Sequence, residues 1–178
     1  MVGVVGVLLA VAVPRMGVFG GTDDARNLSN ALSLAKMRAA ANFTQARLYV
    51  SVGGRNQHVE TWSKTAVPPD WVAVTGPTLL SNGVAFTFGP VGTPPPNTQP
   101  AVAQAPLCVD KDGNAIAGTA CIVFNSRGIP VDGTGAPTNN DALYVTDGTR
   151  VGAVTLSAAG LVTVWSAPLA ANPAWARK

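Results

Sequence analysis

The spacing of apolar residues changes once along this 178-residue chain, and the change restricts the fold class. Between residues 22 and 43, apolar side chains recur every three or four positions, the period of a helix with one buried face. From residue 45 to residue 167 they alternate, the period of half-buried strands. One helix followed by about seven or eight short strands predicts an α+β fold with an antiparallel sheet.

The expected helix covers residues 22–43. Thr22 or Asp23 is suited to cap its first turn, and the two aspartates there are favourable near the positive end of the helix dipole. The predicted buried stripe consists of Leu28, Leu32, Ala35 and Ala39. The rest of the chain has no helix of comparable clarity.

The strand-rich part is divided by Gly and Pro, which together number 33. Residues 45–52 and 58–64 predict a hairpin around Gly53-Gly54, and residues 71–76 and 83–89 predict two further strands. Residues 89–106 are rich in proline and predict an extended surface loop. Residues 107–128 predict a hairpin turning at Asp112-Gly113. Three strands are expected in 141–166, with turns at Asp147-Gly148 and Ala159-Gly160.

The first 13 residues are apolar or glycine, and Pro14 and Arg15 end that run. A signal peptide requires a basic residue ahead of its apolar run, and none precedes this one. It is also shorter than the roughly 20 residues that cross a membrane. We therefore interpret residues 1–21 as the rear part of a longer apolar helix followed by a break, and residues 22–178 as one globular domain.

The composition weighs against most hydrolytic or metal chemistry, because the chain has one histidine, His58, and one glutamate, Glu60. Ser126 is followed at two residues by a glycine, but the preceding glycine of a nucleophile elbow is absent. Residues 110–114 copy the start of a calcium loop, yet its sixth and twelfth positions hold Ala115 and Cys121 rather than Gly and Glu. A turn is the favoured interpretation there. We predict no catalytic residue, no metal ligand and no cofactor.

The two cysteines, Cys108 and Cys121, are not spaced as a zinc site requires. They could be a buried pair of free thiols or a short-range disulfide. The disulfide is the better prediction if the domain works outside the cytosol.

Three stretches together resemble the minor pilins and pseudopilins of the GspH/FimT type, which belong to type IV pili and type II secretion systems. The first is MVGVVGVLLAVAVPRM, residues 1–16, and the second is LSNALSLAKMRAAANFTQARLYVS, residues 28–51. The third is CIVFNSRGIPVD, residues 121–132, with the closing segments ALYVTDG and AVTLSAAGLVTVW. The family's prepilin signature, a basic leader followed by Gly-Phe-Thr-Leu-Ile-Glu, is absent, and we expect it to lie upstream of Met1. Its cleavage, methylation and glutamate sites therefore have no counterpart here.

This resemblance implies a pilin-like fold, in which a long N-terminal helix packs against the antiparallel β-domain. It implies a non-enzymatic subunit that assembles into, primes or caps a pilus or pseudopilus, with other pilins or pseudopilins as partners. Before assembly, the helix would sit in the bacterial inner membrane as a single span with the domain in the periplasm. Within the family's membrane and filament helix fall Val4, Val7, Leu8, Leu9 and Pro14.

The resemblance also suggests an alternative function, since some FimT-type pilins are thought to bind double-stranded DNA during uptake. The candidate contacts here are Arg127, Arg150, Arg177 and Lys178. Scattered solubilising charges are the favoured interpretation, because nucleic-acid binders usually cluster Lys and Arg on one face. The net charge of +3 is too small to decide between the two.

Overall fold

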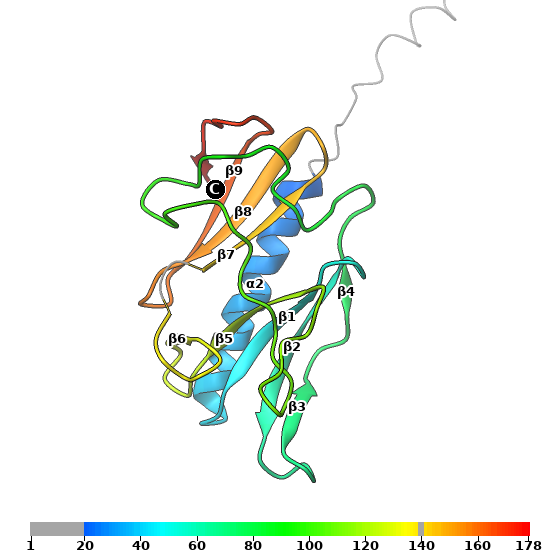
Figure 1. The fold of residues 1–178 in the computed structure, drawn as a ribbon, viewed down its shortest axis with the longest axis vertical. Coiled ribbons are helices and arrows are strands. Elements are labelled where there is room, and N and C mark those ends of the chain that lie inside the picture. The colour runs from blue at the N-terminus through cyan, green and yellow to red at the C-terminus, as the bar shows by residue number, and fades with distance from the viewer. Residues whose placement is uncertain (1–19, 139–140) are drawn as a thin grey trace, which may run out of the picture.

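The computed structural model describes residues 20–138 and 141–178 (Figure 1). Within these residues the chain forms one helix, α2 (Gly20–Ala41), and two antiparallel sheets. The expected α+β class, with a helix packed on antiparallel strands, is confirmed. The apolar run and the predicted helix positions Val4, Val7, Leu8, Leu9 and Pro14 lie outside the described residues.

The first sheet has the strand order β3-β2-β1-β5-β6, with β4 paired to β2, and the second has the order β10-β9-β8-β7. The strands of the first are β1 (Ala46–Ser51), β2 (Asn56–Ser63), β3 (Asp70–Ala73), β4 (Thr78–Leu79), β5 (Thr119–Phe124) and β6 (Pro130–Val131). Those of the second are β7 (Asp141–Thr146), β8 (Arg150–Leu156), β9 (Val162–Pro168) and β10 (Ala176–Arg177). The described residues thus exceed the expected seven or eight strands, because β4, β6 and β10, at two residues each, are too short to show a period.

Helix α2 lies across both sheets and supplies one side of the main core (Figure 1). Its predicted stripe, Leu28, Leu32, Ala35 and Ala39, is fully buried, which confirms the helical pattern. The stripe packs with Leu48 and Ile122 from the first sheet and with Leu143 and Val154 from the second. Both sheets are therefore held together through the helix.

The proline-rich segment, residues 89–106, covers the face of the second sheet that points away from α2. It follows the surface as expected, but Val91, Pro95 and Ala105 are buried. Together with Phe88 and Trp175, the segment encloses Tyr144, which has no exposed surface. Burial raises the pKa of the Tyr144 hydroxyl, which donates a hydrogen bond of 2.8 Å to Gln99 Oε1.

The segment also occupies the outer edge of strand β7. The amide of Ala105 donates to the carbonyl of Ala142 at 2.7 Å. The Gln104 side chain accepts from the Tyr144 amide and donates to the Tyr144 carbonyl, both at 2.8 Å. Ala85 pairs with Thr146 in an isolated bridge. An edge strand with its outward groups occupied offers little for a further strand to pair with.

The predicted hairpin over residues 107–128 turns at Asp112-Gly113 as expected, but its pairing is limited to one antiparallel bridge, Val109 with Ala115. Strand β5 pairs with β1 and β6, and residues 107–118 form a compact turn bound to β5 by a Cys108–Cys121 disulfide. The Asp110 carboxylate stabilises this turn by accepting hydrogen bonds from the amides of Asp112 and Asn114, both at 2.8 Å. The interpretation of residues 110–114 as a turn is confirmed.

The predicted strand over residues 83–89 is wrong. Its first and last glycines have φ of +81° and +56°, which interrupts an extended chain, and the one bridge it forms is that of Ala85 with Thr146. The three closing strands and their turns at Asp147-Gly148 and Ala159-Gly160 are confirmed.

Candidate functional site

The first turn of α2 is fixed to strand β8 and to the loop that follows β4, at the end of the domain where the apolar segment joins. A Cβ atom on Gly20 would lie 3.1 Å from Val84 Cγ2, and one on Gly152 would lie 2.6 Å from the Gly21 carbonyl oxygen. Only glycine allows such a close approach of helix and strand backbones. The helix therefore begins at a fixed position and in a fixed direction.

The buried Asp24 carboxylate completes this attachment. It accepts hydrogen bonds from the Ser81 amide at 3.0 Å and the Ser81 hydroxyl at 3.2 Å. Burial raises the pKa of Asp24 above its ordinary value, although the bonds from Ser81 oppose the shift. Arg55 supports the same loop by donating to the carbonyls of Val84 and Ser81 at 2.8 and 2.7 Å.

A cationic hollow of about 360 Å³ lies beside this first turn. Its cations are Arg26, Arg150 and Lys178, and Thr22, Asp23 and Ser166 complete the lining. The Arg150 guanidinium donates to the Ser166 hydroxyl at 3.3 Å, and that hydroxyl is 3.2 Å from Thr22 Oγ1. The hollow thus joins α2, β8, β9 and the C-terminal residue.

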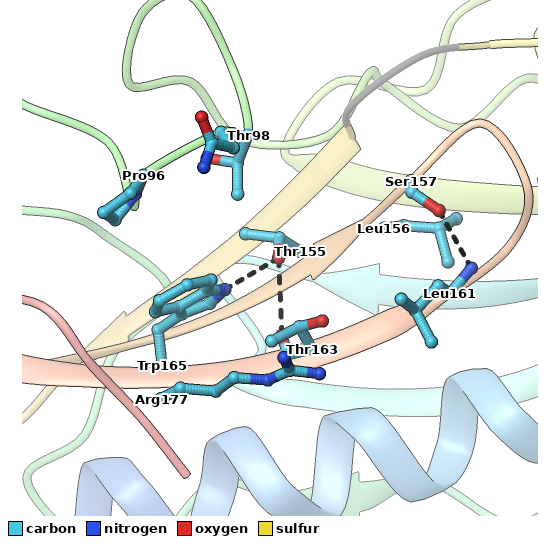
Figure 2. Close-up of a pocket in the computed structure, with 10 residues that line it drawn as sticks. Pro96, Thr98, Thr155, Leu156, Ser157, Leu161, Thr163, Trp165 and Arg177 are labelled. Carbon is cyan, nitrogen blue, oxygen red and sulfur yellow. Dashed lines mark hydrogen bonds between the residues drawn. The ribbon is translucent and has the colours of Figure 1, made fainter.

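A groove of about 300 Å³ crosses the opposite face of the second sheet (Figure 2). Strands β8 and β9 form its floor, and Pro96 and Thr98 of the proline-rich segment form a wall. Trp165 Nε1 donates to Thr155 Oγ1 at 2.9 Å, which fixes the indole within the floor. Arg177 supplies the one charge among the described lining residues. The groove is therefore apolar and hydroxyl-rich with a single cation.

The four residues predicted to contact DNA do not form one surface. Arg150 and Lys178 share the cationic hollow, whereas Arg177 lines the groove on the other face, because neighbouring strand residues point to opposite sides. Arg127 lies in the β5–β6 turn next to Gly128, which packs on Lys36 in the second half of α2. Arg26, at the hollow, was missed by the sequence analysis because its helix position indicated solvent exposure alone.

The residues considered for catalysis are likewise not brought together. His58 Nε2 lies 2.9 Å from Glu60 Oε1 and its ring packs on Tyr49. Ser126 instead lines a hollow with Phe43 and Trp62. Within residues 20–138 and 141–178, no group of three or more His, Cys, Asp or Glu side chains could hold a metal ion.

Within the same residues, no helix is long and apolar enough to cross a membrane.

Comparisons with known proteins identify no family for this chain. No family model matches it, and no curated protein sequence does. Among solved structures, the chain is similar to the minor pseudopilin EpsH from the type 2 secretion system of Vibrio cholerae. That match covers 89% of this chain and 96% of the other, with 12% identity and a TM-score of 0.40. Because both values are low, the proposals below rest on this chain's own residues.

Proposed function

We propose that this chain is a structural subunit of a pilin-like filament, a minor pilin or pseudopilin that assembles through its apolar N-terminal segment. The observation that carries the proposal is the way helix α2 packs in the domain. The helix that follows the apolar segment is the central core element of the domain, and its first turn packs closely against strand β8 and the loop that follows β4. A force or a contact at the N-terminal segment would therefore reach the whole domain.

The composition of the apolar segment suits a helix buried first in lipid and then among other helices. Its residues leave no charge to desolvate before Arg15. Gly3, Gly6, Ala10 and Ala12 are small enough to let helix backbones approach closely. In lipid, a helix satisfies its own backbone hydrogen bonds. On this proposal the protein resides in the bacterial inner membrane until it enters a filament with other pilins or pseudopilins.

Fractionation of the bacterium that encodes the chain tests the proposal. The protein should be found in the membrane fraction and in filaments sheared from the cell surface or isolated from the envelope. The double variant Val7→Asp, Leu8→Asp should be lost from both fractions, because charged side chains are costly in lipid. The matched control is Leu161→Asp, at a side chain that is already 60% exposed, and it should fractionate like the wild type.

Deleting the gene should also reduce the number of filaments or the amount of secreted protein, and these two results separate a pilus from a secretion system. A wild-type protein that is free in the periplasm or medium, and absent from both membranes and filaments, would contradict the proposal.

A second candidate function, binding of double-stranded DNA, is favoured by the cationic hollow alone. Arg26, Arg150 and Lys178 line it, with Asp23 pairing with Arg26 at 3.2 Å, so cations still outnumber the one side-chain carboxylate there. Phosphate groups are the anions that such a site would contact. A gel shift with double-stranded DNA at several salt concentrations tests it, since phosphate contacts weaken steeply with salt. Arg26→Ala with Lys178→Ala should weaken binding, whereas Arg127→Ala should not. No shift at low salt rules this function out.

A further inference from the structure

Helix α2 ends in a hydrogen-bonded reversal that normally requires glycine. The amide of Thr44 donates to the carbonyl of Ala39 at 3.2 Å, and the amide of Phe43 donates to the carbonyl of Ala40 at 3.4 Å. These are the two bonds of a Schellman motif, in which the residue at the Phe43 position adopts the left-handed conformation. Phe43 has a φ of +49°. A bulky side chain in that conformation is a strained exception.

Nothing in the interior of the domain explains the left-handed conformation of Phe43. Two other described non-glycine residues have positive φ, Arg55 and Asn97. Arg55 uses its position to bind two backbone carbonyls, and asparagine tolerates the left-handed region. The Phe43 side chain, by contrast, is 82% exposed. Folding alone would be served better by glycine there, so the ring is explained by something outside the domain.

The residues around Phe43 form an open surface that is held in place by a hydrogen bond and by ring packing. An open hollow of about 380 Å³ lies beside the ring, lined also by Trp62, Lys64 and Ser126. Thr44 Oγ1 donates to the Trp62 carbonyl at 2.9 Å, and the Trp62 ring packs edge-to-face on Trp71 at 5.4 Å. We call this surface the Phe43 tip, defined by Phe43, Thr44, Gln45, Trp62, Lys64, Asn125 and Ser126.

Lys64 is the one charged residue among the described residues that line the Phe43 tip, and two arginines stand close to it along the chain. Lys64 lines the hollow, Arg127 follows Ser126 directly, and Arg38 stands in the last turn of α2. No acidic residue is among the described residues that line it. Apolar anchors surrounded by charges of one sign fit a partner with a pocket and charges of the other sign. One lysine in the hollow, with two arginines nearby in the chain, is too little for a nucleic acid, which is held through a row of phosphate contacts.

We propose that the Phe43 tip is the docking surface for a partner protein that presents an apolar pocket edged by carboxylates. The Phe43 ring enters the pocket, and Lys64, Arg38 and Arg127 face the carboxylates. The proposal depends on the tip and not on filament assembly.

Photo-crosslinking in the native bacterium tests the proposal. Benzoylphenylalanine, itself a phenylalanine derivative, replaces Phe43, and captured proteins are identified with their crosslinked peptides by mass spectrometry. The probe at Phe43 should capture one protein, through a peptide that contains aspartate or glutamate. The same probe at Leu79, 72% exposed on β4, is the matched control and should not capture it.

Two further variants separate docking from folding. With the probe at Ser126, Lys64→Glu should abolish capture, and replacing the partner's crosslinked carboxylate residue by lysine should restore it. Phe43→Gly should also abolish capture while its melting temperature equals or exceeds that of the wild type. If Phe43 served only the fold, Phe43→Gly would keep capture and lower the melting temperature.

The proposal is overturned if position 43 captures no protein, or if Leu79 captures the same protein equally well. It is overturned too if the captured species is nucleic acid or a second copy of this chain, or if Phe43→Gly keeps full capture. Filament fractionation is measured separately, so docking can fail while the proposed filament role stands, and the reverse.

Discussion

Arg47 is the most completely enclosed cation of the described chain, on the face of the first sheet that points away from α2. Its Nε donates to Glu60 Oε2, its Nη1 donates to the Val109 carbonyl at 2.6 Å, and its guanidinium lies 4.1 Å from the Trp71 ring centroid. Burial lowers the pKa of Arg47, and Glu60 opposes that shift. Arg47 is buried and the Glu60 side chain is 12% exposed, so the two charges form a largely enclosed pair, with His58 as a second partner of Glu60.

We expect Arg47→Met to lower the free energy of unfolding by about 3–5 kcal/mol, because it leaves the Glu60 carboxylate buried without its main partner. The double variant Arg47→Met, Glu60→Leu should recover most of this loss, since an apolar pair needs no compensation. Urea denaturation of the wild type, both single variants and the double variant gives the coupling energy. Additive losses from the two single variants would contradict a coupled pair.

Asp24 provides a pH dependence with a definite sign. Its pKa is raised by burial, so the folded state takes up a proton at a higher pH than the unfolded chain, whose value is about 3.9. The stability that protonation adds is complete below the unfolded value and is lost as pH rises through the folded value. At neutral pH the buried charge thus opposes folding.

Asp24→Asn should therefore raise the melting temperature at pH 7, because an amide can still accept from the Ser81 amide and donate to the Ser81 hydroxyl. The advantage should shrink as the pH falls through the raised pKa of Asp24, where the wild-type carboxyl becomes neutral. Asp110→Asn is the opposite control. Hydrogen bonds from Asn114 lower the pKa of Asp110, so that variant should lose stability at neutral pH and recover in acid. Equal shifts at every pH would refute this explanation.

At the level of single residues, the sequence predicted burial that follows from the spacing of apolar residues along the chain. It did not predict features that depend on contacts between distant residues. The stripe from Leu28 to Ala39 follows from spacing alone, and it is buried as expected. The left-handed Phe43 could not be predicted, since glycine is the residue expected at that position. Nor could the grouping of Arg26 with Lys178, because it requires the C-terminal end to return beside the start of α2.

Strand β7 shows how one side chain can replace a neighbouring strand at the scale of an element. Gln104 supplies both an acceptor and a donor to Tyr144, the pattern of a paired backbone. Without it, the amide and carbonyl of an otherwise buried residue would lose their partners. Unpaired buried groups cost roughly 1–3 kcal/mol each.

Gln104→Ala should therefore destabilise the protein by about 2–6 kcal/mol and increase its tendency to aggregate through the uncovered edge. Gln104→Glu should be intermediate, because a carboxylate accepts from the Tyr144 amide but cannot donate to its carbonyl. Chemical denaturation and light scattering at several protein concentrations measure the two effects. If Glu and Ala at this position behaved alike, the two-sided hydrogen bonding would have no energetic importance.

The elements that the sequence predicted well are those whose turns carry their own chemistry. Gly148 and Gly160, at φ of +84° and +75°, fix the hairpins on both sides of β8, and both were predicted. The segment 83–89 alternates like a strand but lies across the edge of β7, where a single bridge replaces a ladder. Its covering role depends on the second sheet, which no local pattern reveals.

For the whole molecule, α2 is the element that makes one unit of two sheets. No strand of one sheet pairs with a strand of the other among the described residues, and the shared core is built on the helix. The sequence pattern predicted one antiparallel domain because alternation marks the faces of strands and not their membership of a sheet. The division into two sheets follows from chain connections that bring β5 beside β1 and β7 beside β8.

Gly152 tests whether this joint governs the stability of the whole domain. A Cβ atom there would lie 2.6 Å from the Gly21 carbonyl oxygen and 3.0 Å from Ala25 Cβ, so α2 must move away from β8 to admit it. We expect Gly152→Ala to cost about 1–3 kcal/mol of unfolding free energy, and Gly152→Val to cost more. Gly53→Ala is the matched control, because nothing lies within 4 Å of its Cβ position.

The unfolding transition shows whether α2 couples the two sheets or whether the substitution at Gly152 disturbs only its own sheet. Trp62 and Trp71 report on the first sheet, and Trp165 reports on the second. If α2 joins the sheets into one cooperative unit, single-tryptophan versions of Gly152→Ala should unfold at one common midpoint, shifted equally for both sheets. A midpoint that falls for Trp165 alone would mean that the second sheet can detach while the first stays folded. The seating of α2 would then be too weak to transmit a pull from the N-terminal segment to the entire domain.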